Sequence, residues 1–185
     1  MAFQELLNGL LATAADDGAN ADQIASLEAA REVGAITPEV MRQALENYGQ
    51  CVAELGMTYS WGDPTGPPDF PTFTFRVSVP TGISNELMDT CYASHARLLH
   101  TAYQLQPALR EAQGRVIAEH RDAIIACLAD AGTTIEPDAT VDELRRAVMT
   151  AATGVIPGEV DSPPPGFTPH DCTGAAGMTI REFGY

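Results

Sequence analysis

The stretch CVAELG at residues 51–56 recurs as CLADAG at residues 127–132, and this repeat decides the fold. Both copies follow the pattern Cys, apolar, Ala, acid, any residue, Gly. Each copy continues an apolar stripe at helical spacing and ends at glycine, which tolerates the left-handed conformation that follows many helices. The repeat therefore predicts two helices that each carry a cysteine near the C-terminal end. It is a framework signal and matches no catalytic signature.

The spacing of the cysteines predicts how the first pair is joined. If a hairpin follows the first of these helices, the chain reverses and returns to the point where the hairpin began. The end of the helix before the hairpin then lies beside the start of the helix after it. Cys51 lies about five residues before Gly56, and Cys91 lies about six residues after Asn85. At 1.5 Å per residue, each cysteine lies roughly 8 to 9 Å along its helix from the end that adjoins the hairpin. Because the two depths match, a Cys51 to Cys91 disulfide is expected.

The chain has four cysteines, and the even number favours two disulfides and an oxidising compartment. Pairing Cys51 with Cys91 leaves Cys127 for Cys172, which requires the C-terminal segment to fold back. The other two connectivities stay open, as do four buried free thiols.

Apolar residues at helical spacing and capping residues predict the other helices. The expected helices run from Phe3 to Leu11, after Asn20, after Thr37, from a cap at Ser84 or Asn85 to Leu105, from Leu109 to Leu128, and after the capping box Thr140 to Glu143.

Two runs change to the alternating pattern of strands. Residues 57–61 (MTYSW) and 73–79 (FTFRVSV) are rich in aromatic and β-branched side chains and are separated by an irregular loop. They are expected to pair as an antiparallel hairpin. The fold class is therefore α+β, mainly α, with about five to six helices, one antiparallel β-hairpin and a disulfide staple.

The composition also divides the chain. Residues 1–153 are expected to form a helical domain with the hairpin insertion at 57–79. Residues 154–185 are rich in Pro and Gly, as in SPPPG at 162–166, and are expected to form a tail tied back by Cys172.

The net charge of −15 arises because 25 acidic residues face 10 basic residues, all of which are Arg. Such a surface repels phosphate backbones and anionic lipids, so neither nucleic acid nor a charged membrane surface is an expected partner. No apolar run approaches the roughly 18 residues of a transmembrane segment. A basic partner fits this charge, and nothing in the sequence indicates an oligomeric state.

The first residues, MAFQELL, lack the basic start and long apolar core of a secretory leader. If this N-terminus is native, the protein is cytoplasmic. The cysteines favour the other alternative, in which a leader has been removed and the protein is extracytoplasmic, either secreted or on the cell surface.

A metal or redox site can be drawn from Cys91, His95, His170 and Cys172. The spacing lacks the short Cys-x-x-Cys or His-x3-His pair of most structural zinc sites, so no metal or other cofactor is expected. His95 and His120 both fall in apolar stripes, which favours core histidines. No residue pattern indicates a catalytic group, for a hydrolase or any other enzyme.

The hairpin carries Tyr59 and Trp61, and its loop carries Phe70. Aromatic side chains on an irregular loop are typical of a recognition surface, although the same side chains can pack on the core. The leading hypothesis is a non-enzymatic, extracytoplasmic interaction module that binds a protein or cell-envelope component through these three residues. A metal- or redox-active protein is the alternative.

The order of these motifs resembles a group of uncharacterised exported proteins and lipoproteins of high-GC actinobacteria. The residues that carry the resemblance are ITPE at 36–39, YGQCVAELG at 48–56, CY at 91–92 and YQLQ at 103–106, within roughly residues 20–135. The group has no assigned activity. The resemblance implies export and disulfides, and it implies no reaction.

Overall fold

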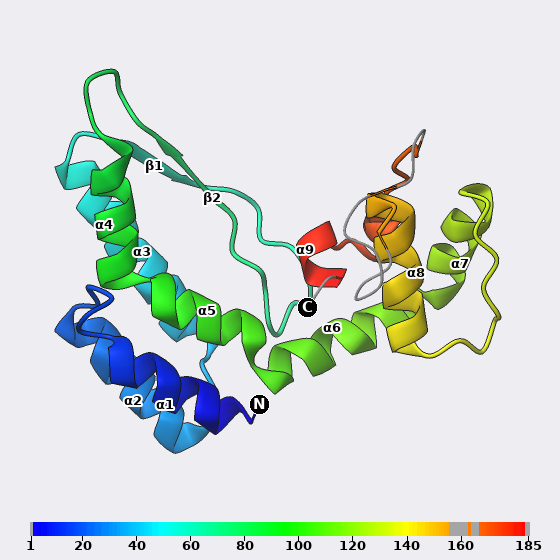
Figure 1. Ribbon diagram of the computed structural model, residues 1–185, viewed down its shortest axis with the longest axis horizontal. Coiled ribbons are helices and arrows are strands. Elements are labelled where there is room, and N and C mark those ends of the chain that lie inside the picture. The colour runs from blue at the N-terminus through cyan, green and yellow to red at the C-terminus, as the bar shows by residue number, and fades with distance from the viewer. Residues whose placement is uncertain (1, 156–162, 164–166, 184–185) are drawn as a thin grey trace. The chain divides into compact units, whose positions relative to one another are not determined.

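The computed structural model describes residues 2–155, Pro163 and 167–183. The chain forms two compact units (Figure 1). The first unit comprises Met1–Pro64 and Asp69–Leu109, and the second comprises Thr65–Pro68 and Arg110–Tyr185. Within the described residues, no helix is long and apolar enough to cross a membrane.

The first unit contains five helices and a hairpin among its described residues. These elements are α1 (Phe3–Thr13), α2 (Ala21–Val33), α3 (Pro38–Glu54), β1 (Thr58–Trp61), β2 (Phe75–Ser78), α4 (Asn85–His95) and α5 (Arg97–Leu105). The predicted N-caps are present, since the side chains of Asn20, Thr37 and Ser84 each accept a hydrogen bond from the first turn of the helix that follows.

The predicted antiparallel hairpin is confirmed, with shorter strands than expected. The register pairs Thr58 with Ser78 and Trp61 with Phe75. Strand β1 lies against α3, which carries the chain into the hairpin (Figure 1). The mainly α, α+β class is therefore correct, and the hairpin gains a helical surface on which to pack.

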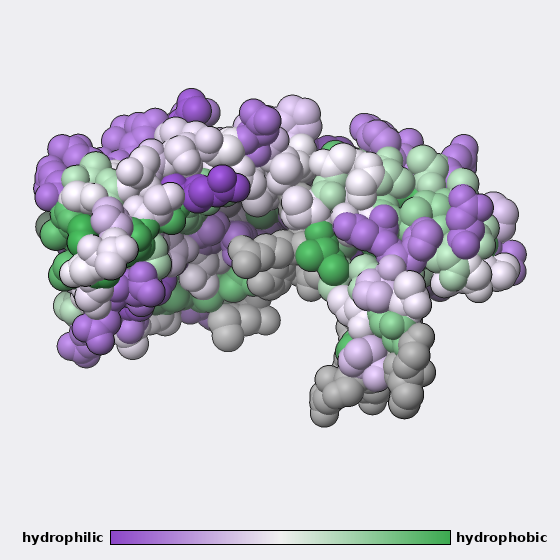
Figure 2. Space-filling view, turned by 90° about the horizontal axis from the view of Figure 1, so that it is seen from above, coloured by the Kyte–Doolittle hydropathy of each residue, from purple (hydrophilic) through white to green (hydrophobic). Residues whose placement is uncertain are grey.

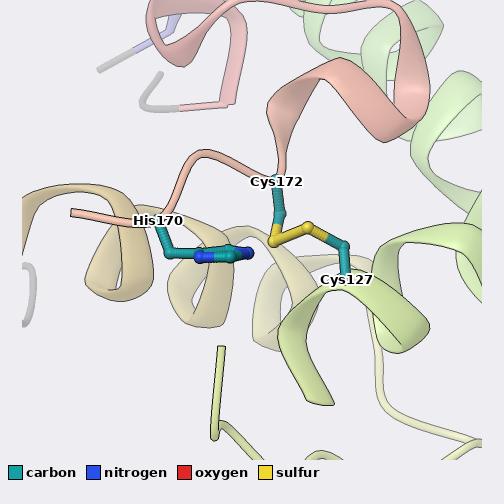
Figure 3. A group of neighbouring side chains, drawn as sticks. All are labelled: Cys127, His170 and Cys172. Carbon is teal, nitrogen blue, oxygen red and sulfur yellow. A yellow bond between two sulfur atoms is a disulfide. The ribbon is translucent and has the colours of Figure 1, made fainter. Parts of the chain in front are cut away.

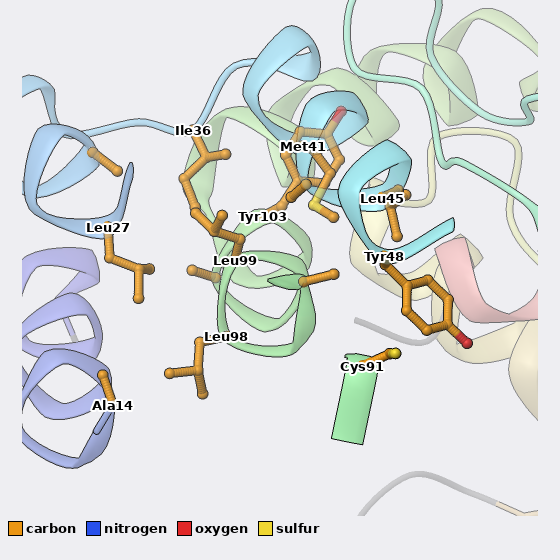
Figure 4. Close-up of a cluster of buried hydrophobic side chains, with 14 of the residues drawn as sticks. Ala14, Leu27, Ile36, Met41, Leu45, Tyr48, Cys91, Leu98, Leu99 and Tyr103 are labelled. Atoms are coloured by element: carbon orange, nitrogen blue, oxygen red, sulfur yellow. The ribbon is translucent and has the colours of Figure 1, made fainter. Parts of the chain in front are cut away.

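The core of the first unit is formed by apolar side chains from every helix of the unit (Figure 4). Leu27 of α2, Leu45 of α3 and Leu99 of α5 are at most 1% exposed. Cys91 and Tyr48 lie at the edge of this cluster, where α4 faces α3. The apolar stripes of the sequence thus point inward as their helical spacing predicts.

The helix expected from Asn85 to Leu105 is divided at Ala96, which corrects the sequence prediction. The side chain of Gln23 of α2 is buried at the break. Its Nε2 donates to the carbonyls of Ala93 and Ser94 at 2.8 and 2.7 Å, and its Oε1 accepts from the Leu98 amide at 2.8 Å. A side chain distant in sequence therefore satisfies the backbone groups that the break exposes.

The helix expected from Leu109 to Leu128 is also divided, at His120. The second unit accordingly contains most of α6 (Pro107–Glu119), followed by α7 (Arg121–Asp130), α8 (Val141–Thr153), the short 3-10 helix η1 (Thr173–Ala176) and α9 (Ile180–Phe183). The predicted capping box at the start of α8 is present, with Glu143 accepting from the Thr140 amide. Because two predicted helices divide, the described residues contain more helices than the five to six expected.

The C-terminal segment contributes to the core of the second unit. Cys172, Met178 and Phe183 are each at most 4% exposed and pack with Leu128 and Leu144 of the preceding helices. Most of the SPPPG stretch, predicted to belong to an irregular tail, lies outside the described residues.

Replacing Gln23 by Met should lower the free energy of unfolding by on the order of 2 to 4 kcal/mol, because the amide and carbonyl groups at the helix break lose their partner while the buried volume is kept. The control is Gln50→Met on the exposed face of α3, for which a change below about 0.5 kcal/mol is expected. Urea unfolding with the disulfides intact measures both. Equal stabilities of the two variants would contradict this role of Gln23.

Candidate functional site

Both predicted disulfides are present. The Cys51 to Cys91 disulfide joins α3 to α4 with a Cα–Cα distance of 5.8 Å, and the Cys127 to Cys172 disulfide joins α7 to the segment before η1 with a Cα–Cα distance of 5.7 Å. No cysteine is free. Cys91 is thus bonded to Cys51 and offers no free thiol to the metal or redox set drawn from the sequence.

Trp61 ends β1 and remains partly accessible, with 38% of its surface exposed. Its indole ring contacts Tyr59 and Phe73 in edge arrangements, with centroids 5.5 and 6.1 Å apart. The guanidinium of Arg42 on α3 lies 5.7 Å from the ring centroid. These neighbours hold the indole in one position while leaving part of it accessible to a partner.

Phe70 has a different environment. Its ring is half-buried and lies 6.3 Å from Tyr103 of α5, whose ring is also contacted by Phe73. The Tyr103 hydroxyl donates to the Pro71 carbonyl at 3.0 Å and so fixes the loop backbone on α5. The hairpin aromatics therefore differ in role: Phe70 packs on the core, whereas Trp61 is exposed and could contact a partner.

Tyr59 lies between these two cases, half-buried against α3. Its ring stacks with Phe75 and meets Tyr48 edge-on, with centroids 5.7 and 5.8 Å apart. It also explains Gly49, since a Cβ atom there would lie 2.7 Å from the Tyr59 ring. The Tyr59 hydroxyl is buried without a hydrogen-bond partner among the described residues. Burial, and to a lesser extent Tyr48 and Glu46, raises the pKa of this phenol.

The four residues of the alternative metal site fall in different units. Cys91 and His95 belong to the first unit, and His170 and Cys172 belong to the second. The Nδ1 atom of His95 lies 3.0 Å from the Nδ2 atom of Asn20, the N-cap of α2. His95 thus packs as a half-buried, hydrogen-bonded side chain, close to the prediction.

The expectation that His120 is a core residue is wrong. Its side chain is exposed, and its Nδ1 atom lies 2.9 Å from the Val116 carbonyl at the break between α6 and α7. The apolar stripe that placed it inside assumed one continuous helix. Dividing that helix at this residue changes the face on which its side chain lies.

The structure groups His170 with both cysteines of the second disulfide. The donor atoms of Cys127, His170 and Cys172 all lie within 4.8 Å of one another, and the imidazole points toward the sulfur atoms (Figure 3). The sequence motif HDC indicated His170 and Cys172. Cys127 was left out of the metal set drawn from the sequence, although the expected Cys127 to Cys172 disulfide places it beside these two residues.

A cavity of about 120 Å³ lies in the first unit between α2, α3, α4 and α5. Its polar lining includes Asn20, Gln23, Gln43, Asn47 and His95. The amides of Asn20, Gln23 and Gln43 are already engaged in hydrogen bonds within the unit. The cavity therefore presents few unused polar groups to a ligand.

Tyr59→Phe should leave the free energy of unfolding unchanged or raise it by up to about 1 kcal/mol, because the hydroxyl it removes is buried without a partner. Tyr103→Phe is the matched control and should cost about 1 kcal/mol, since it deletes the hydrogen bond to Pro71. Urea unfolding at neutral pH distinguishes them. A loss of stability in Tyr59→Phe as large as in Tyr103→Phe would contradict the assignment.

The raised pKa of Tyr59 also predicts how stability depends on pH. Because the pKa of Tyr59 is raised in the folded state, its phenol ionises first in the unfolded chain, and the free energy of unfolding therefore falls as the pH rises above the ordinary tyrosine pKa of about 10. The stability of Tyr59→Phe should therefore fall less steeply above about pH 10 than that of the wild type. Parallel curves for the two proteins would contradict this cause.

The chain matches no protein-family model, no curated protein and no solved structure. The resemblance to exported actinobacterial proteins consequently rests on the quoted motifs alone. Three features of the structure bear on function, namely the disulfides, the hairpin and the group around His170.

Proposed function

We propose that the protein is a non-enzymatic, extracytoplasmic interaction module, which binds a protein or cell-envelope component through Trp61 and the adjoining hairpin residues Tyr59 and Phe70. The observation that carries this proposal is the partly exposed indole of Trp61, held by aromatic and cationic neighbours at the end of a strand. Tryptophan is among the residues that dominate the binding energy of protein interfaces.

The two disulfides support the extracytoplasmic part of the proposal. Disulfides persist in oxidising compartments and are rare where cellular thiols keep cysteines reduced. All four cysteines are paired, and each pair joins segments at least 40 residues apart in sequence. Such crosslinks stabilise a fold mainly by restricting the unfolded chain, which suits a protein that works outside the cell.

The hairpin is suited to binding because its aromatic side chains are already ordered. Trp61 contacts Tyr59, Phe73 and Arg42, so few rotamers remain to be lost when a partner binds. Phe70 and the Pro71 carbonyl are fixed on Tyr103, which holds the loop beside the strand. A preorganised aromatic anchor loses less entropy on association than a mobile one.

Charge indicates the kind of partner. The chain carries −15 net charge, and hydrophilic residues cover much of the face seen in Figure 2, with smaller apolar areas between them. A partner with a basic surface would be attracted to this protein, and nucleic acids and anionic lipids would be repelled. We therefore favour a protein or envelope component that offers positive charge around an apolar pocket for the indole.

Trp61→Ala should weaken binding of the native partner by more than about tenfold, because the partner loses its main apolar anchor. The measurement is capture from a solubilised envelope fraction, followed by titration of the captured component against the purified protein. Val33→Ala is the matched control, since Val33 is 77% exposed on α2, away from the hairpin strands. It should bind as the wild type does.

Thermal unfolding separates binding from packing in this experiment. Trp61→Ala should keep the melting temperature within a few degrees of the wild type, whereas Phe70→Ala should lower it more, because Phe70 packs against Tyr103 in the core. If Trp61→Ala stays folded and retains full affinity, the binding surface is not at this hairpin. If it unfolds, Trp61 is a core residue and the proposal fails.

A further inference from the structure

We propose that Cys127, Cys172 and His170 form a redox-gated site for a thiophilic divalent ion such as Zn²⁺, which binds when the disulfide is reduced and leaves when it forms again. This site is in the second unit and does not depend on the hairpin function. It differs from the set drawn from the sequence, because Cys127 replaces the two residues of the first unit, Cys91 and His95.

The distances suit such an ion. The three donor atoms lie within 4.8 Å of one another while the two sulfur atoms are bonded. In a tetrahedral zinc site the sulfur ligands are about 2.3 Å and the nitrogen ligand about 2.0 to 2.1 Å from the ion, which places ligand atoms about 3.5 to 3.8 Å from one another. Small rotations of the cysteine side chains after reduction would therefore open the space that the ion needs.

The three ligands are held by contacts other than the disulfide. Cys127 is on the last turn of α7. The amide of His170 donates to the Ala151 carbonyl of α8 at 2.9 Å, which fixes the backbone before Cys172. These contacts would keep the donors close together after the sulfur–sulfur bond is broken.

The backbone just after Cys172 is fixed as well. The Asp171 carboxylate accepts from the Thr173 amide at 2.9 Å and from the Thr173 hydroxyl at 2.6 Å. Thr173 is itself buried at the start of η1. Cys172 therefore sits between two anchored neighbours, and its position does not depend on the bond to Cys127 alone.

Access to the site is also suitable. His170 is exposed and Cys127 is half-buried, whereas Cys172 is fully buried. An ion or a small thiol can thus approach from the side of His170. With three protein ligands, the fourth position of a tetrahedral ion remains open to water or to another ligand, as in zinc sites that are not purely structural.

The chemistry balances in both directions. A dithiol reductant gives two electrons and two protons to the disulfide, which yields the thiols of Cys127 and Cys172. These thiols release two protons as the ion binds to the two thiolates and to the imidazole nitrogen. A small-molecule disulfide then takes two electrons from the thiolates and two protons from solvent and becomes two thiols, while the protein disulfide forms again and the ion leaves.

The first disulfide provides an internal control. Among the described residues, Cys51 and Cys91 belong to no comparable group of three His, Cys, Asp or Glu donors. Reduction of both disulfides should therefore create one tightly binding site per chain. His120 is a matched control for His170, because it is also an exposed histidine, near the start of α7.

The test is anaerobic titration with Co²⁺, whose absorption reports tetrahedral thiolate coordination, on the fully reduced full-length protein. We expect one Co²⁺ per chain, displaced by Zn²⁺. The affinity should fall by at least about tenfold in His170→Ala and be unchanged in His120→Ala. The thiolate absorption should be absent in Cys127→Ala/Cys172→Ala, and the oxidised wild type should not bind.

Two further measurements keep the result interpretable. Circular dichroism of the reduced wild type and of His170→Ala checks that both proteins remain helical. Both histidine variants keep all four cysteines, so they test the site without removing a disulfide. Adding an oxidised small-molecule disulfide to the Zn²⁺-loaded protein should release one equivalent of Zn²⁺ to a colorimetric chelator. The proposal is wrong if the reduced wild type binds no Co²⁺, if it unfolds, if His170→Ala binds as tightly as the wild type, or if oxidation leaves Zn²⁺ bound.

Discussion

The Cys51 to Cys91 disulfide is the constraint on which the rest of the first unit depends. It joins the last turn of α3 to the second half of α4, the two helices from which the hairpin leaves and to which it returns. An isolated two-stranded hairpin is marginal in water and needs a surface to pack on. Here Tyr48 of α3 supplies that surface through edge contacts with the rings of Tyr59 and Phe75.

The second disulfide holds the C-terminal segment against the helices of the second unit. It joins Cys172 to α7 and brings the buried side chains of η1 and α9 into the core of the second unit. It also brings His170 beside two sulfur atoms. This crosslink thus supplies two of the three donor atoms of the redox-gated metal site that we propose.

Local signals in the sequence were enough to predict much of this fold. Matched helix depths gave the Cys51 to Cys91 pair, and the alternating aromatic runs gave the hairpin. The helix breaks at Ala96 and His120 were not predicted, and the backbone at Ala96 is hydrogen-bonded by a side chain from a distant helix. The break at Ala96 is stabilised by Gln23, which is at least 70 residues away in sequence from the groups it binds.

The candidate sites were likewise predicted in part from local sequence patterns, and the rest depends on tertiary packing. The aromatic residues of the hairpin were identifiable by type, but only packing shows that Phe70 is held on Tyr103 and that Trp61 remains exposed. His170 was identifiable as a possible ligand. Its proximity to Cys127 follows from the expected Cys127 to Cys172 pairing, which was reached by elimination among the four cysteines and not from a local pattern.

Disulfide mapping of the native protein tests the central claim most directly. The folded protein is alkylated without reductant, digested, and analysed by mass spectrometry. We predict crosslinked peptides for Cys51 with Cys91 and for Cys127 with Cys172, and no alkylated cysteine. Four alkylated cysteines, or crosslinks in either of the other two connectivities, would contradict it.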